Sequence, residues 1–167
     1  MSKNDEGTQA AKDKVQVGDL APGFTLLNQS GAEVSLEEYL GKTDLVLYFY
    51  PRDHTAVCTE EACAFRDSYE IIQAAGAEVI GVSSDSVESH RQFAEENQLP
   101  FTLLSDAGGA IRTRYRAPTA FGLPGRVTYI IDQQGIVRNI FFSQFTSKRH
   151  VDVALETLQA IHEGQVQ

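Results

Sequence analysis

The chain alternates between short apolar runs and segments in which apolar residues recur every three or four positions. The runs DLVLYFY (44–50), AEVIGVS (77–83) and LPFTLLSD (99–106) predict buried strands. Between the first two, the apolar or small residues at 58, 62, 65, 69 and 72 share one helical face that ends at Gly76. A second helix is predicted over Val87–Asn97. Strand–helix–strand units of this kind predict a sheet covered by helices.

The flanking segments complete this prediction. Residues 17–36 form extended pieces with a turn at 30–31, and a short helix is predicted near 111–115. RVTYIID and GIVRNIFF flank the turn 132–135 as a hairpin, and VDVALETLQAIHEG (151–164) is an amphipathic helix. We expect an α/β fold with a mixed central sheet and helices on both faces. Residues 1–14 predict a flexible tail, and residues 15–164 a single domain.

Composition and charge narrow the classes of function. A chain of 167 residues can bury a core without cross-links. The polar first residues predict no signal peptide, and no apolar stretch reaches the length of a membrane span. With a net charge of −9 and scattered Lys and Arg, nucleic acid and membrane surfaces are not expected partners. We expect a reducing compartment, the cytoplasm, unless a transit peptide has been removed.

The two cysteines of the chain, Cys58 and Cys63, lie in one segment. A structural disulfide, half of a metal site and a reactive pair are the three alternatives. The first is disfavoured by the reducing compartment, and a thioredoxin-type Cys-x-x-Cys is absent from the sequence. A zinc site needs further close ligands, so we expect no metal. The histidines form no close pair, and each is expected to be a surface or loop residue: His54, His90, His150 and His162.

Cys58 falls in the first turn of the helix that follows a buried strand. The partial positive charge of a helix N-terminus favours the reactive thiolate. Thr55 is placed to cap this helix and to direct its hydroxyl toward whatever approaches the sulfur. Glu60 and Glu61 oppose a thiolate, so a cation must compensate; the candidates are Arg52, Arg66 and Arg126. From position alone, Cys58 could equally be a small buried apolar residue.

The motif Pro51-x-x-x-Thr55-x-x-Cys58 resembles the active-site motif of peroxiredoxins, the thiol peroxidases of the thioredoxin fold. VGDLAPGFTL, CTEEACAFRDSYE, LPFTLLSD and FGLPGRVTYIID are similar to segments of the peroxiredoxin Q group, also called bacterioferritin comigratory proteins. The resemblance runs from about residue 15 to about residue 158 and is closest to plant and cyanobacterial members, which implies a chloroplast-type stroma or lumen if a transit peptide has been removed. This group commonly has Pro and Gly between the Thr and the Cys, where this chain has Ala56 and Val57.

The resemblance implies a role for each motif residue. Cys58 is expected to attack the peroxide and become a sulfenic acid, and Cys63 to resolve it as an intramolecular disulfide. Thioredoxin or a similar dithiol protein would reduce that disulfide, and no cofactor is expected. Pro51 is expected to shield the sulfur, Thr55 to hydrogen-bond the thiolate and the peroxide, and Arg126 to supply positive charge. Hydrogen peroxide and alkyl hydroperoxides are the expected substrates.

Two other functions compete with this interpretation. A thiol glutathione peroxidase relative also uses a cysteine at a helix start, but that family relies on a Trp, and this chain has none. A non-enzymatic thioredoxin-fold module, with incidental thiols, is the third possibility. Consumption of peroxide with thioredoxin and its reductase separates them.

The spacing of the two cysteines makes a geometric prediction. Five residues of α-helix leave two Cα atoms roughly 8 to 9 Å apart, and a disulfide tolerates about 7 Å. The pair therefore cannot close in an intact helix, and we expect oxidation to unwind the chain from Thr55 to about Arg66. Since both sulfurs lie in one helix, we expect a catalytically complete monomer.

Overall fold

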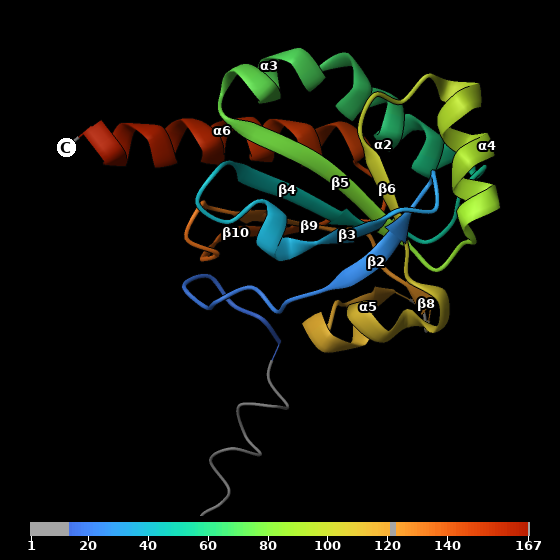
Figure 1. Cartoon of the computed structure of the whole chain (residues 1–167). Coiled ribbons are helices and arrows are strands. Elements are labelled where there is room, and N and C mark those ends of the chain that lie inside the picture. The colour runs from blue at the N-terminus through green and yellow to red at the C-terminus, as the bar shows by residue number, and fades with distance from the viewer. Residues whose placement is uncertain (1–13, 121–122, 167) are drawn as a thin grey trace, which may run out of the picture.

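The computed structural model describes residues 14–120 and 123–166, so most of the expected N-terminal tail lies outside the described residues. The elements follow in the order β2 Thr25–Asn28, β3 Glu33–Ser35, η1 Leu36–Glu38, β4 Asp44–Phe49, α2 Ala56–Asp67, α3 Tyr69–Ala74, β5 Ala77–Ser83, α4 Val87–Asn97, β6 Thr102–Ser105, η2 Ala107–Gly109, α5 Ala110–Tyr115, β7 Thr119–Ala120, β8 Leu123–Pro124, β9 Val127–Ile131, β10 Val137–Phe142 and α6 Ser147–Val166 (Figure 1).

A seven-stranded mixed sheet with the order β10-β9-β4-β5-β6-β2-β3 forms the centre of the molecule. Strands β4, β5 and β6 pair in parallel, and β9 pairs antiparallel with β4. Strands β9 and β10 pair antiparallel, as the predicted hairpin requires. The mixed α/β sheet predicted from the sequence is confirmed.

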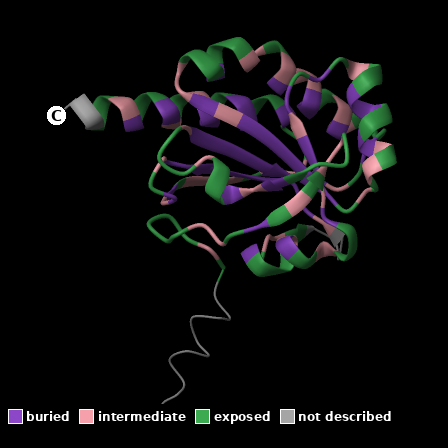
Figure 2. Cartoon of the chain, in the orientation of Figure 1, coloured by how far each residue is buried: buried purple, intermediate pink, exposed green. Residues whose placement is uncertain are grey.

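Helices cover both faces of this sheet, as Figure 1 shows: α2, α3, α4 and α6 lie over one face and α5 lies over the other. Side chains of β4 alternate between the two apolar layers, as the two-residue period of a strand dictates. Val46, Tyr48 and Tyr50 pack under α2, and Leu45, Leu47 and Phe49 pack on the opposite face. All six residues of β4 are buried, which explains the continuous apolar run in the sequence (Figure 2).

The helix predicted from Cys58 toward Gly76 is two helices. The first, α2, ends at Asp67, and α3 begins at Tyr69. The predicted buried stripe is confirmed at Cys58, Ala62, Phe65 and Ile72, which are all buried, whereas Tyr69 is only half-buried. The C-terminal helix begins at Ser147, before the predicted start at residue 151. No helix in the described part of the chain is long and apolar enough to cross a bilayer.

Candidate active site

The loop that leaves β4 leads directly into α2, and Cys58 lies in the first turn of that helix, 2% exposed. Thr55 has the extended backbone of an N-cap residue. Its side chain, however, makes no capping hydrogen bond; the hydroxyl donates instead to the carbonyl of Arg52 at 2.9 Å. The predicted position of Thr55 is confirmed, and the predicted side-chain cap is wrong.

Arg126 is the cation that the structure brings to Cys58. Its Nη1 donates to Cys58 Sγ at 3.2 Å, and the side chain is only 4% exposed. Burial alone lowers the pKa of Arg126, but the neighbouring Glu61 and Cys58 outweigh burial and the pKa is raised. Of the other two candidates, Arg52 is exposed and Arg66 donates to the carbonyl of Asn97.

Two hydrogen bonds to Gln144 hold Arg126 in this orientation. Its Nε donates to the carbonyl of Gln144 at 3.2 Å, and its backbone N–H donates to Gln144 Oε1 at 3.0 Å. Gly125 precedes it, where a Cβ would lie 2.6 Å from the carbonyl oxygen of Pro118. A side chain at position 125 would therefore displace the backbone that carries Arg126. The sequence analysis identified neither Gln144 nor Gly125.

Glu61 is a second acid at this site. It is fully buried, and its Oε1 accepts from Arg126 Nη1 at 2.9 Å. Its Oε2 has no hydrogen-bond partner among the described residues. Burial raises the pKa of Glu61 to about 8, although Arg126 acts in the opposite direction. Glu60, its neighbour in sequence, is exposed.

His150 contradicts the expectation that the histidines lie in surface or loop positions, because it is fully buried in α6. Its Nε2 donates to the carbonyl of Ser143 at 2.9 Å, and its Nδ1 lies 2.8 Å from Thr128 Oγ1. Burial lowers the pKa of His150 to about 4, so the ring is neutral at neutral pH. The 3.6 Å contact between His150 Nδ1 and Glu61 Oε2 is therefore no ion pair there.

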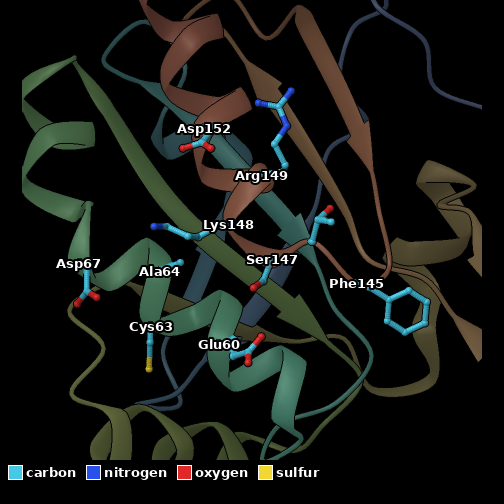
Figure 3. A pocket seen from close by; sticks show the side chains of 10 residues that line it. Glu60, Cys63, Ala64, Asp67, Phe145, Ser147, Lys148, Arg149 and Asp152 are labelled. Carbon is cyan, nitrogen blue, oxygen red and sulfur yellow. The ribbon is translucent and has the colours of Figure 1, made fainter.

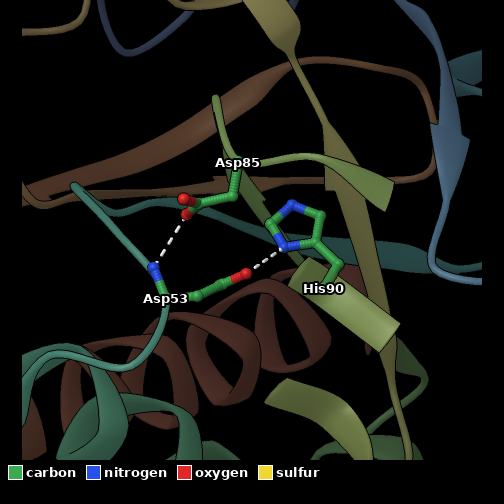
Figure 4. A group of neighbouring side chains, drawn as sticks. All are labelled: Asp53, Asp85 and His90. Carbon is green, nitrogen blue, oxygen red and sulfur yellow. Dashed lines mark hydrogen bonds and ion pairs between the residues drawn. The ribbon is translucent and has the colours of Figure 1, made fainter. Parts of the chain in front are cut away.

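His90 is also fully buried, again against expectation. Its Nδ1 lies 2.7 Å from Asp53 Oδ2 (Figure 4). Its Nε2 lies 3.0 Å from the carbonyl oxygen of Leu104. Asp85 accepts from the backbone N–H of Asp53 at 2.7 Å. This network ties the loop before α2 to α4.

The same three side chains, Asp53, Asp85 and His90, lie within 4.8 Å of one another, a spacing that a metal site could have. Hydrogen bonds already engage both nitrogens of His90 and both carboxylate oxygens of Asp53. A cation would have to displace these bonds, so we interpret the cluster as structural. The two remaining histidines, His54 and His162, have partly exposed side chains, as the sequence analysis expected of surface residues.

Cys63 lies in the same helix as Cys58, half-buried, and both thiols are free. Its Sγ lies 3.8 Å from Asn97 Oδ1. Cys63 stands at the α2 wall of a cavity of about 670 Å³ between α2 and the start of α6, with its sulfur directed away from Lys148 and Arg149 (Figure 3).

Pro51, the first residue of the motif, is half-buried at the carboxyl end of β4. It lines a separate cavity of about 380 Å³ together with Tyr50, Arg112 and Pro124. The structure thus brings Cys58 and Arg126 into contact, places Thr55 at the helix start and places Pro51 at the head of the loop.

Comparison with known proteins adds independent evidence. Residues 17–140 match the model of the AhpC/TSA family. The chain is 50% identical over 150 residues to a chloroplastic peroxiredoxin Q of Sedum lineare, covering 89% of this chain and 80% of the relative. It is 52% identical over 149 residues to that of Arabidopsis thaliana, covering 88% and 68% of the two chains.

Solved structures agree with this relationship. The crystal structure of peroxidoxin BcpB from Mycobacterium tuberculosis aligns with a TM-score of 0.82 and 35% identity over 88% of this chain and 98% of the other. A peroxiredoxin Q of Xanthomonas campestris aligns with a TM-score of 0.75 and 29% identity, over 82% and 90%.

Proposed function

The chain belongs to the AhpC/TSA family and is a peroxiredoxin, and on that premise we propose that Cys58 is its peroxidatic cysteine and Cys63 its resolving cysteine. The observation that carries this proposal is the 3.2 Å contact between Arg126 Nη1 and Cys58 Sγ at the start of α2. A guanidinium and a helix N-terminus both favour the thiolate, which is the nucleophilic form.

The first chemical step breaks the O–O bond of hydrogen peroxide or an organic hydroperoxide. The thiolate of Cys58 attacks the terminal oxygen, an S–O bond forms, and hydroxide or alkoxide leaves and takes up a proton as water or alcohol. Arg126 offsets the negative charge that moves from sulfur to the leaving oxygen. Thr55 stands at the same helix start, three residues before Cys58, and is proposed to turn its hydroxyl from the Arg52 carbonyl to the bound peroxide.

The second step regenerates the enzyme. The Cys63 thiol attacks the sulfenic sulfur of Cys58, the S–S bond forms and water leaves. A dithiol protein of the thioredoxin type then reduces the disulfide by exchange, and the oxidised partner carries the electrons away. Since both sulfurs belong to one helix, a monomer completes this cycle. The chloroplastic names of the plant relatives support a plastid-type location.

The division of labour is tested by turnover with thioredoxin and its reductase. Cys58→Ser should lose peroxide consumption entirely. Cys63→Ser should consume about one equivalent and then stop as sulfenic acid or a higher oxide. Full turnover by Cys58→Ser would refute the assignment, and a thioredoxin-independent wild type would refute the reductant while leaving the peroxidase intact.

The disulfide requires part of α2 to open. The geometry of an intact helix keeps the two sulfurs too far apart, and the sequence predicts unwinding to about Arg66. The packing of Phe65 supports a shorter segment, because its side chain is fully buried and stacks on Tyr48 at a centroid distance of 4.6 Å. Removing a buried Phe from the core costs about 2 to 3 kcal/mol. We expect the opening to stop before Phe65.

Amide exchange of the reduced and oxidised protein measures this opening. Protection should fall over residues 55–64 on oxidation and persist from Phe65 onward. Ala56 and Val57 should slow the opening relative to the Pro and Gly common in the group, which favours overoxidation. An Ala56→Pro, Val57→Gly double variant is the matched control and should resolve faster. Equal protection in both redox states, with the disulfide present, would contradict helix opening.

A further inference from the structure

Two buried acids contact the same guanidinium nitrogen. Nη1 of Arg126 donates to Cys58 Sγ at 3.2 Å and to Glu61 Oε1 at 2.9 Å. The three side chains are at most 4% exposed. Burying an uncompensated charge is costly, and one positive charge compensates one negative charge. The thiolate and the Glu61 carboxylate therefore compete for Arg126.

The surroundings of the second Glu61 oxygen favour a proton on it. Oε2 lies 3.6 Å from His150 Nδ1, too far for a hydrogen bond. Nε2 of His150 donates to the Ser143 carbonyl, so in the neutral ring Nδ1 carries no hydrogen, and its lone pair accepts from Thr128 Oγ1 at 2.8 Å. His150 therefore has no hydrogen to offer Oε2, and an ionised Oε2 would be buried with no donor among the described residues. The raised pKa of Glu61 and the lowered pKa of His150 agree with that arrangement.

A further titratable neighbour among the described residues is Tyr48 on β4. It is 1% exposed, and its hydroxyl has no hydrogen-bond partner in the described part of the chain. Burial and the charges of Glu61 and Cys58 raise the pKa of Tyr48 well above its usual value, so it stays neutral. Cys58 and Glu61 from α2, Arg126 from the start of β9, His150 from α6 and Tyr48 from β4 are thus the groups that set the charge of the site.

We propose that Cys58 and Glu61 hold one proton between them, so that Glu61 is protonated while Cys58 is a thiolate and releases its proton when the thiolate is consumed. This inference rests on Cys58 being the peroxidatic cysteine. Ionisation then transfers a proton from the Cys58 thiol to the Glu61 carboxylate without changing the net charge of the buried site. Glu61 acts through Arg126 and is a positioning residue for charge and proton, not a group that touches the peroxide.

The proton balance of the peroxide step follows. The thiolate and hydrogen peroxide give sulfenic acid and hydroxide; an S–O bond forms and the O–O bond breaks. Glu61 ionises once the anion on sulfur has gone, and its proton converts the hydroxide to water. Above about pH 8, where Glu61 ionises beside a neutral sulfur, the site therefore takes up little or no proton from solvent. With Gln at position 61, the same step takes up one proton from solvent for each peroxide consumed.

The experiment measures this proton count with a pH indicator in weakly buffered solution. The Cys63→Ser background stops the reaction at sulfenic acid, and Glu61→Gln and Glu60→Gln are added to it separately. From about pH 8 to pH 9, where Glu61 ionises beside a neutral sulfur, the parent and the Glu60→Gln control should take up well under one proton. The Glu61→Gln protein should take up about one. Uptake of one proton by all three proteins would overturn the proposal.

The pH profile of Cys58 alkylation by iodoacetamide supplies a second readout. Removing the competing carboxylate should shift its midpoint about one unit to lower pH in Glu61→Gln. If Glu61 serves only to hold Arg126 in place, the midpoint should rise instead, and that result would also overturn the proposal.

A third measurement needs no change at Glu61 and covers a Glu61→Gln protein that fails to fold. Alkylation of the parent by iodoacetamide forms an S–C bond, expels iodide and should release the Glu61 proton. Proton release should therefore persist above the midpoint of the rate profile. Release that falls together with thiolate formation contradicts proton sharing. This count needs no peroxide chemistry, so it separates failure of this inference from failure of the proposed function.

Discussion

Two buried carboxylates flank the start of α2, and their environments push them toward opposite charge states. Asp53 lies in the loop before the helix and is 2% exposed; Glu61 lies inside the helix and is fully buried. The pKa of Asp53 is lowered, whereas the pKa of Glu61 is raised to about 8. Burial acts in the same direction on both, so burial does not decide the difference.

The number of donors decides it. Asp53 accepts three hydrogen bonds: from Tyr50 Oη at 2.6 Å, His90 Nδ1 at 2.7 Å and Ser89 Oγ at 2.8 Å. These bonds, that of His90 first, outweigh burial. Glu61 accepts one bond, from a guanidinium that it shares with a thiol. A buried carboxylate with donors on both oxygens stays ionised, and one with a donor on a single oxygen retains its proton more readily.

The partner histidines differ in the same way. Both nitrogens of His90 are within hydrogen-bond distance of acceptors, the Asp53 carboxylate at 2.7 Å and the Leu104 carbonyl at 3.0 Å. His150 donates at Nε2 only and is neutral at neutral pH. The first pair is fully hydrogen-bonded and anchors the loop. The Glu61–His150 contact belongs to the proposed proton-sharing site. Reactive centres commonly contain groups that gain and lose protons.

The largest effect is expected from Asp53→Asn, which breaks the pair between Asp53 and His90. This change removes the anionic partner from a fully buried hydrogen-bonded pair, which costs about 3 to 5 kcal/mol. The pKa of Asp53 is lowered in the folded state, so its contribution is present above about pH 4 and is lost as the pH falls through the folded value. Urea unfolding at pH 7 should show the full loss, and unfolding in acid a smaller one.

The exposed Asp152→Asn is the control for this loss and should change stability little. An Asp53→Asn protein as stable as wild type at pH 7 would show that the Asp53–His90 pair is not charged.

The next largest effect concerns Arg126, the cation that contacts both Cys58 and Glu61. Arg126→Met removes the charge that offsets both Cys58 and Glu61, and the rate of peroxide attack should fall by about 10²- to 10³-fold. The alkylation profile of Cys58 should move to higher pH. Arg66→Met is the control. It removes an arginine of α2 that donates to the Asn97 carbonyl, and it should leave the alkylation profile unchanged. An unchanged profile in Arg126→Met would remove Arg126 from the mechanism.

The sequence allows the central strands and the position of Cys58 to be predicted, and it carries a signal for the burial of Glu61 and His90. The apolar runs predicted the central strands because β4 is buried along its whole length. The motif predicted Cys58 at a helix start next to a strand end. Periodicity also carried a signal for Glu61, three residues after Cys58 and four before Phe65, and hence on the buried face of α2. His90 stands likewise three residues before the buried Phe93.

The sequence could not show which hydrogen-bond partners allow Glu61 and His90 to be buried. A charged residue on a buried face is acceptable only when a donor arrives from elsewhere, and Arg126 lies 65 residues from Glu61 along the chain. Leu104, Gln144 and Ser143 contribute backbone carbonyls, which no side-chain pattern encodes. The expectation that the histidines lie at the surface failed at His90 and His150 for this reason.

The smallest effect tests whether donors add up at Asp53. Ser89→Ala removes one of its three hydrogen bonds, and because Ser89 is half-buried, water can replace part of that bond, so we expect a loss of about 1 kcal/mol at pH 7. In this variant Asp53 loses one donor and becomes slightly more like Glu61. The folded pKa of Asp53 therefore rises toward its unfolded value. The penalty is therefore present above about pH 4 and disappears below both pKa values.

Ser86→Ala is the matched control for Ser89→Ala, since Ser86 caps the same helix by accepting from the Ser89 backbone N–H at 3.1 Å. Loss of that cap costs a similar free energy, about 1 kcal/mol, but engages no titrating group and should be independent of pH. Urea unfolding of both variants at about pH 7 and about pH 3 distinguishes them. A Ser89→Ala penalty of equal size at both pH values would mean that Asp53 does not need its third donor to remain ionised, and that two donors already separate it from Glu61.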